Sequence, residues 1–234
     1  MLDLRRKHRL IGERLMMSNP RFNQNDYWID RHQKLRGDPR SVGNLGRSKE
    51  ENLLGDKRIT DGISWIVGEY VETGKVLDIG CGYGRVASVF IDRGLDYTGI
   101  DVAPAAIDAA RVREPRGNYL IGSALEILPT LVKQRARFNL ICGLYVLVHF
   151  VEDEDWLNLL KLLAGCLADD GALLIADEFS ERSDRPIAHV HNRPLQAYVE
   201  SLEDLHLKRD ANFKTKLVNE WRYGGSPPPF EMFR

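Results

Sequence analysis

Residues 76–85 read VLDIGCGYGR, and this stretch decides the fold. Its apolar start predicts a buried strand, and the residues that follow it have the apolar spacing of a helix. The turn between them holds Gly80, Gly82 and Gly84, which predict a sharp bend that a ligand can approach closely. Asp101 ends the next predicted strand, 21 residues past Gly80, where a carboxylate can accept hydrogen bonds from both hydroxyls of a ribose. Two other interpretations stay open: a turn without a ligand, and an Asp101 that only caps the next helix.

The spacing of the glycines and a neighbouring acid discriminate between two adenosine cofactors. The dinucleotide pattern G-x-G-x-x-G places its last glycine three residues after the second, whereas here the glycines are two residues apart. Asp78 precedes them, and a carboxylate at the mouth of the turn would repel a pyrophosphate. The same carboxylate suits S-adenosylmethionine (SAM), which carries an ammonium and a sulfonium. These features favour SAM over NAD.

Strand-like and helix-like segments alternate on both sides of this turn. Short apolar runs predict five strands, over residues 75–79, 97–101, 119–122, 138–142 and 172–176. The intervening segments have helical spacing, most clearly over 152–167, where acidic residues precede an apolar stripe. This alternation predicts an α/β fold with a parallel sheet that is covered by helices on both faces.

The glycine turn resembles the first motif of class I SAM-dependent methyltransferases, in particular those that act on small molecules. Residues 97–104, which read YTGIDVAP, resemble the second motif, and residues 144–149, which read LYVLVH, resemble the fourth-strand motif. The resemblance extends over residues 60–180. It implies a Rossmann-like, doubly wound and mostly parallel sheet of seven strands, with an antiparallel last strand and an N-terminal helical cap.

The resemblance also implies ten cofactor-binding residues. Those expected at the methionine end of SAM are Asp78, Gly80, Gly82, Gly143 and Leu144, and Cys81 of the same turn is also expected to bind the cofactor. Those expected at the adenosine end are Asp101, Val102, Ser123 and Ala124. Cys81 is interpreted as a small filler of the turn rather than a nucleophile. Two positions depart from the family pattern, because Ser123 replaces an acid that accepts from the adenine amino group and Asn139 replaces a fourth-strand aspartate.

His149 follows the predicted fourth strand and is the candidate general base. Ligands of open α/β folds bind at the carboxyl edge of the sheet, and a base there accelerates methylation of a hydroxyl by about 10²–10⁴. A packing role at the start of the next helix is the alternative. His189 and His191 follow the fifth strand at the same edge, where they either contact the substrate or lie in a solvated loop.

Residues 1–50 are polar, basic and partly aromatic, and we expect a cap or lid rather than a separate domain. Residues 51–234 are expected to form the SAM-binding domain. Tyr27 and Trp28 are large aromatic residues in a polar stretch, suited to close over adenosine or a flat acceptor. Packing against the main domain is the alternative for this pair.

The composition of the 234 residues argues against several classes of protein. A formal net charge of −1 argues against nucleic acid as a partner. No apolar run approaches the ~18 residues that a membrane helix needs. The three cysteines are widely spaced, which argues against disulfides and zinc and favours a cytoplasmic protein. We predict no metal, and the formation of a homodimer stays open.

Together these features predict a methyltransferase that moves a methyl group from SAM to an oxygen or nitrogen of a small-molecule acceptor. A SAM- or nucleoside-binding module without catalysis is the alternative outside enzymes, and a NAD-dependent oxidoreductase is the alternative enzyme. Methylation of RNA or protein is a further variant. The near-neutral charge argues against RNA, and no amine-binding motif like Asn-Pro-Pro-Tyr follows the fourth strand.

Overall fold

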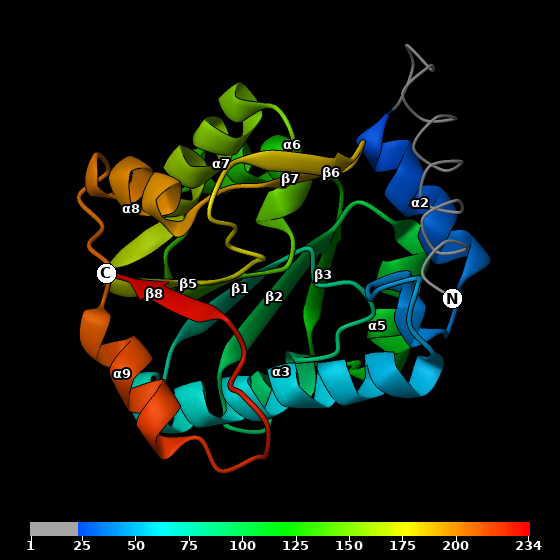
Figure 1. Ribbon diagram of the computed structural model, residues 1–234, viewed down its shortest axis with the longest axis horizontal. Coiled ribbons are helices and arrows are strands. Elements are labelled where there is room, and N and C mark those ends of the chain that lie inside the picture. Colours follow the sequence, from blue (N-terminus) through cyan, green and yellow to red (C-terminus); the bar gives the residue numbers. More distant parts are fainter. Residues whose placement is uncertain (1–22) are drawn as a thin grey trace.

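The buried apolar runs lie side by side as parallel strands of one central sheet (Figure 1). The computed structural model describes residues 23–234. The order across the sheet is β3 (Asn118–Ile121), β2 (Asp96–Asp101), β1 (Lys75–Ile79), β4 (Phe138–Leu144), β5 (Leu167–Ala176) and β8 (Phe230–Phe233). Only β8 runs antiparallel to its neighbour. The predicted α/β, doubly wound and mostly parallel sheet with an antiparallel last strand is confirmed.

The prediction of seven strands is wrong for the described part of the chain, where the main sheet has six. The segment before α9 (Ala211–Glu220) begins to pair with the free edge of β8, because Arg209 forms an isolated antiparallel bridge with Phe233. The pairing stops at Asp210, whose side chain caps the start of α9. The place of a seventh strand is therefore taken by a segment too short to count as one.

Successive side chains of a strand point to opposite faces, so the buried strands carry two apolar cores. Val76 and Leu140 belong to the first core, and Leu77 and Ile141 belong to the second. The first core is covered by α3 (Lys49–Tyr70), α4 (Ala87–Ile91), α5 (Pro104–Arg113) and α9, and the second by α6 (Ala124–Lys133), α7 (Asp153–Cys166) and α8 (Leu195–Glu203). Figure 1 shows α3 and α9 on one side of the sheet and α6, α7 and α8 on the other. Among the described residues, no helix combines the length and the hydropathy needed to cross a membrane.

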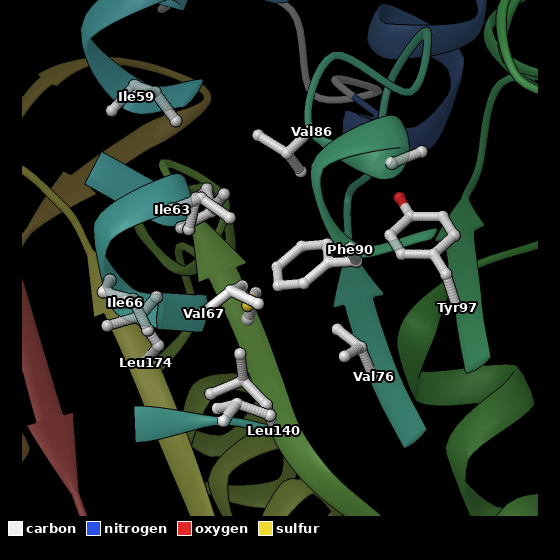
Figure 2. Packing of buried hydrophobic residues seen from close by; sticks show 14 of the residues in the cluster. Ile59, Ile63, Ile66, Val67, Val76, Val86, Phe90, Tyr97, Leu140 and Leu174 are labelled. Carbon is white, nitrogen blue, oxygen red and sulfur yellow. The ribbon is translucent and has the colours of Figure 1, made fainter. Parts of the chain in front are cut away.

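The long helix α3 fixes the central strands from one side. Its residues Ile63, Ile66 and Val67 are directed toward Val76 of β1 and Leu174 of β5 (Figure 2). Complete burial of an aliphatic side chain contributes about 1.5–3 kcal/mol to stability. The strand that precedes the glycine turn is therefore held firmly, and so is the start of the turn.

The helix α2 (Gln24–Lys34) and the short η1 (Pro39–Ser41) form the described part of the predicted cap. Figure 1 shows α2 at the end of the molecule opposite β8, and it contacts α5. Residues 1–22 of the predicted cap lie outside the described residues. The predicted boundary between residues 50 and 51 falls in the first turn of α3, which begins after Ser48 with a capping box to Glu51. The division at this boundary stays a prediction.

A two-stranded hairpin follows β5, in a segment that we expected to be a loop. It consists of β6 (Asp184–Ile187) and β7 (Val190–Asn192). The turn between the two strands carries His189. Figure 1 shows the hairpin extending toward the first residues of α2, so two segments far apart in the sequence meet there.

Candidate functional site

The turn after β1 requires glycine at two positions. Gly80 and Gly82 have φ angles of 67° and 55°, which side chains disfavour. A Cβ atom at Gly80 would lie 2.5 Å from Cγ2 of Val146, and one at Gly82 would lie 2.4 Å from Cγ1 of Val42. Both the backbone conformation and the space around it therefore exclude a side chain.

A cavity of about 310 Å³ opens at the carboxyl edge of the parallel strands. Its walls are the segments that follow β1, β2, β3 and β4, together with α2 and the segment behind it. Open α/β sheets bind ligands at this edge, and small-molecule sites have volumes of this order. Seven of the ten predicted cofactor-binding residues line the cavity: Gly80, Cys81, Asp101, Val102, Ser123, Ala124 and Leu144.

Three predicted cofactor-binding residues, Asp78, Gly82 and Gly143, do not line the cavity. Asp78 is buried, and its carboxylate accepts a hydrogen bond of 2.8 Å from the Tyr97 hydroxyl. Burial raises the pKa of Asp78 to about 7, although the bond from Tyr97 opposes the rise. We expected this carboxylate at the mouth of the turn, where it would favour the positively charged SAM. The structure does not place it there, because Asp78 joins β1 to β2 instead.

Asp101 lines the cavity where β2 ends. One of its oxygens accepts from the Gly82 N–H and the other from the Ala103 N–H, both at 2.9 Å. Each carboxylate oxygen still has a lone pair for a further donor, such as a ribose hydroxyl. Burial raises the pKa of Asp101, and the nearby His32 opposes that rise. The carboxylate thus orders the glycine turn and the start of α5, and it also faces the cavity.

Several residues that the sequence did not single out also line the cavity, among them His32, Arg85 and Tyr145. Arg85 pairs with Asp56 of α3 at 2.8 Å. Tyr145 has a φ of 61°, a strained conformation that is common at functional sites. Arg85 and Tyr145 belong to the quoted motifs, so the sequence already contained a reason to expect both residues at the site. His32 lies in a polar helix without any motif, and no signal pointed to it.

His149 ends the short η2 (Leu147–His149) after β4, and it lines the cavity. Its Nδ1 lies 2.7 Å from the carbonyl oxygen of His189. Nδ1 therefore carries the ring proton, and Nε2 keeps its lone pair. Burial lowers the pKa of His149 to about 4, so the ring is neutral at pH 7. A neutral imidazole with a free Nε2 can accept a proton or a hydrogen bond from a ligand.

Four rings from three segments meet beside the cavity, and we call Tyr27, Trp28, His149 and His189 the aromatic cluster. The ring centroids of Trp28 and His149 lie 4.6 Å apart, and Tyr27 stacks on His189 at 4.1 Å. Trp28 and His149 line the cavity, whereas Tyr27 and His189 do not. The predicted base His149 and the predicted substrate residue Trp28 thus lie in the wall of the cavity, and the predicted substrate residues Tyr27 and His189 pack against that wall.

His191 does not line the cavity, and it is not solvated either. Its Nδ1 lies 2.9 Å from the Val151 carbonyl oxygen. Arg193 adds hydrogen bonds to the Phe150 carbonyl at 3.1 Å and to the Asp153 carboxylate at 2.7 Å. These two side chains hold the loop that follows His149, and this buried bracing role was not among the alternatives drawn from the sequence.

A family model described as "Methyltransferase domain" matches residues 25–224. Among curated proteins, the ubiquinone biosynthesis O-methyltransferase of Idiomarina loihiensis is 33% identical over 103 residues, which cover 44% of this chain and 41% of that protein. The 18S rRNA (guanine-N(7))-methyltransferase of Bos taurus is 41% identical over 54 residues, which cover 23% of this chain and 19% of that protein. The chain thus spans less than half the length of these relatives.

Solved structures of similar fold cover most of the chain. A SAM-dependent methyltransferase of Leishmania major has a TM-score of 0.64 at 14% identity and covers 92% of this chain and 84% of its own. The magnesium protoporphyrin IX methyltransferase of Synechocystis, solved with SAM, also has a TM-score of 0.64 at 14% identity, and the match covers 92% of this chain and 98% of that protein. The 1,6-didemethyltoxoflavin N1-methyltransferase of Burkholderia thailandensis has a TM-score of 0.60 at 14% identity, and the match covers 92% of this chain and 91% of that protein. At these identities the likeness shows a shared fold.

Proposed function

The chain belongs to the methyltransferase domain family, and we propose that it is a class I SAM-dependent methyltransferase that methylates an oxygen or nitrogen of a small-molecule acceptor. Membership of this family argues against the alternative that the glycine turn binds NAD in an oxidoreductase. The inactive SAM-binding module is left as the alternative, and only a measurement of turnover separates it from the enzyme.

The observation that carries the proposal is the cavity beside the glycine turn, with Asp101 in its wall. The residues present fit SAM. The Asp101 oxygens can accept from the ribose hydroxyls, and Val102 and Ala124 offer an apolar surface to the adenine. Gly80 lets the methionine portion approach the backbone, since a side chain there would meet Val146. Arg85 lines the same cavity, and its guanidinium, which pairs with Asp56 at 2.8 Å, has further N–H groups that suit a carboxylate.

When bound, SAM supplies a methyl group on a positively charged sulfur, which makes that methyl an electrophile. The residues of this chain then have to align the acceptor with it, and such alignment contributes about 7–11 kcal/mol toward the barrier. Trp28 and other residues of α2 line the cavity and would position the acceptor beside the methyl group. Nε2 of His149 takes or holds the proton of the acceptor, because Nδ1 is already bound to the His189 carbonyl.

A small acceptor is supported by the size of the cavity and by the residues of α2 that line it. The names of similar proteins also support a small-molecule acceptor, and they include methylation of oxygen as well as of nitrogen. One curated relative is an O-methyltransferase of ubiquinone biosynthesis, and one protein of similar fold is a toxoflavin N-methyltransferase. We therefore leave oxygen and nitrogen as equal candidates within the proposed function.

The test begins with thermal unfolding in the presence of S-adenosylhomocysteine (SAH), SAM or NAD. A ligand at 100 times its Kd stabilises the native state by about 2.7 kcal/mol, so SAH and SAM should raise the Tm and NAD should not. Transfer of tritium from methyl-labelled SAM to a panel of small hydroxyl and amine compounds follows. Stabilisation by NAD alone would overturn the proposal, and binding of SAH without transfer to any acceptor would favour the inactive module.

A further inference from the structure

One wall of the cavity is not needed by the cofactor residues, and it is aromatic. Trp28 of α2 and His149 of η2 form it, and Phe150 continues it. Behind them lie Tyr27 and His189, which stack on each other at 4.1 Å. Flat rings favour stacked or edge-on partners at such distances. This wall therefore suits an acceptor with a planar ring.

A buried positive charge lies behind the same wall. The Arg31 guanidinium packs over the Trp28 ring, with Cζ 4.9 Å from its centroid, and its side chain is buried. Its hydrogen bonds go to neutral oxygens, namely the Tyr27 hydroxyl at 3.2 Å and the carbonyls of Arg40 and Gly43. Within the described residues no carboxylate forms an ion pair with it. A cation buried among neutral partners favours negative charge nearby.

The carboxylates that line the cavity do not cancel this charge at the aromatic wall. Asp101 lies at the glycine turn, where two backbone N–H groups and His32 face it. Asp155 is exposed in the first turn of α7, where water and the N-terminus of the helix offset its charge. The aromatic wall thus combines flat rings, a free imidazole nitrogen and a positive field.

We propose that the acceptor is a flat aromatic compound whose methylated group is an acidic hydroxyl, bound against the wall that Trp28 and His149 form. This inference rests on the proposed function and names the substrate class of that site. The acceptor oxygen forms a bond to the methyl carbon while the carbon–sulfur bond breaks, and the electron pair of that bond stays on sulfur. The hydroxyl proton passes to Nε2 of His149 and then to solvent.

The basicity of His149 supports this class of acceptor. Burial lowers its pKa to about 4, and the Arg31 charge adds to that effect. Such a weak base is poorly matched to an aliphatic alcohol, whereas a phenolic hydroxyl has an ordinary pKa near ~10 and is far more acidic. A protonated amine would meet the charge of Arg31 and would have no lone pair to accept the methyl group.

The first experiment measures binding to the protein saturated with SAH, with 2-naphthol, cyclohexanol and benzylamine as probes. Quenching of tryptophan fluorescence and calorimetry should show that 2-naphthol binds most tightly. Trp28→Leu should weaken 2-naphthol binding roughly three- to tenfold, since aromatic contacts are lost. Trp221→Leu is the matched control, because that ring packs on Tyr223 at 5.0 Å and does not line the cavity. All variants should bind SAH with the wild-type affinity.

The second experiment tests the charge. Arg31→Gln should lower the preference for 2-naphthol over benzylamine by roughly tenfold, because a nearby cation no longer opposes the amine. Cyclohexanol binding as tightly as 2-naphthol, or an unchanged 2-naphthol affinity in Trp28→Leu, would overturn the inference. In either case SAH binding and transfer to an aliphatic alcohol or amine would leave the proposed function standing. Absence of SAH binding in the wild type would remove the proposed function itself.

Discussion

The two halves of the cavity are built in different ways. The cofactor half consists of short segments that directly follow β1, β2 and β3, and two backbone N–H groups of these segments hold the Asp101 carboxylate in place. The acceptor half is assembled from side chains of α2, η2 and the β6–β7 hairpin. Residue 28 and residue 189 lie 161 positions apart in the chain, yet their rings are 5.9 Å apart.

This difference has a physical origin. The strand order brings the ends of neighbouring parallel strands to one edge, so the cofactor half follows from the sheet itself. The acceptor half depends on where a cap and a hairpin pack, and the sheet does not dictate that. We therefore expect changes in the cofactor half to act on SAH affinity, and changes in the acceptor half to act on turnover.

The largest effect is expected for Asp101→Ala. The carboxylate is expected to accept from two ribose hydroxyls, and each hydrogen bond to a charged group contributes about 1.5–3 kcal/mol. The Kd of SAH measured by calorimetry should therefore rise by about 100-fold or more. Asp96→Ala is the control, because Asp96 is exposed at the opposite end of the same strand. An SAH affinity close to that of the wild type in Asp101→Ala would mean that Asp101 serves only the backbone of the turn.

A smaller effect, and of a different kind, is expected for His149→Gln. Loss of a general base lowers turnover by 10² or more in typical enzymes, and we expect about 100-fold in kcat with 2-naphthol as acceptor. The Kd of SAH should stay within about twofold, since the cofactor half is not altered. His206→Gln provides the same substitution away from the cavity. If the kcat of His149→Gln equals that of the wild type, the ring has a packing role. Turnover would then not distinguish the acceptor half from the cofactor half.

The same contrast explains which features the sequence predicted. The glycine turn and Asp101 are local motifs between regular elements, so their place at the sheet edge followed from the alternation of strands and helices. The direction of the Asp78 side chain did not follow, because it depends on the Tyr97 hydroxyl of a neighbouring strand.

In the acceptor half, the sequence identified the aromatic residues but not their roles. Trp28 and His149 meet across the cavity wall, whereas His191 braces a loop through the Val151 carbonyl. Nothing in the spacing of His189 and His191 separates these roles, since the β6–β7 hairpin sets which ring faces α2. His32 lacked any signal, because its place beside Asp101 arises only when α2 packs there.

A buried carboxyl group beneath the acceptor half offers the smallest test. Asp177 follows β5, is 1% exposed, and accepts a hydrogen bond of 2.9 Å from the Tyr198 hydroxyl. Burial raises the pKa of Asp177 to about 8, well above the ordinary value near ~3.9. The folded protein therefore holds this proton more tightly than the unfolded chain does. The stability that it contributes is complete below about pH 4 and declines as the pH rises through about 8.

Asp177→Asn removes this titration and keeps an oxygen that can accept from Tyr198. Urea unfolding at pH 5 and pH 8 gives the free energy of unfolding of both proteins. The value of the variant minus that of the wild type should increase by about 1 kcal/mol or more between the two pH values. Asp78, whose pKa burial also raises, titrates in both proteins and cancels in the difference. Asp170→Asn, at an exposed position, should show no such gain. If the difference in unfolding free energy between Asp177→Asn and the wild type does not change with pH, Asp177 is ionised in the folded state. The affinity for SAH should be the same in the wild type and in both variants, because the cofactor half is untouched.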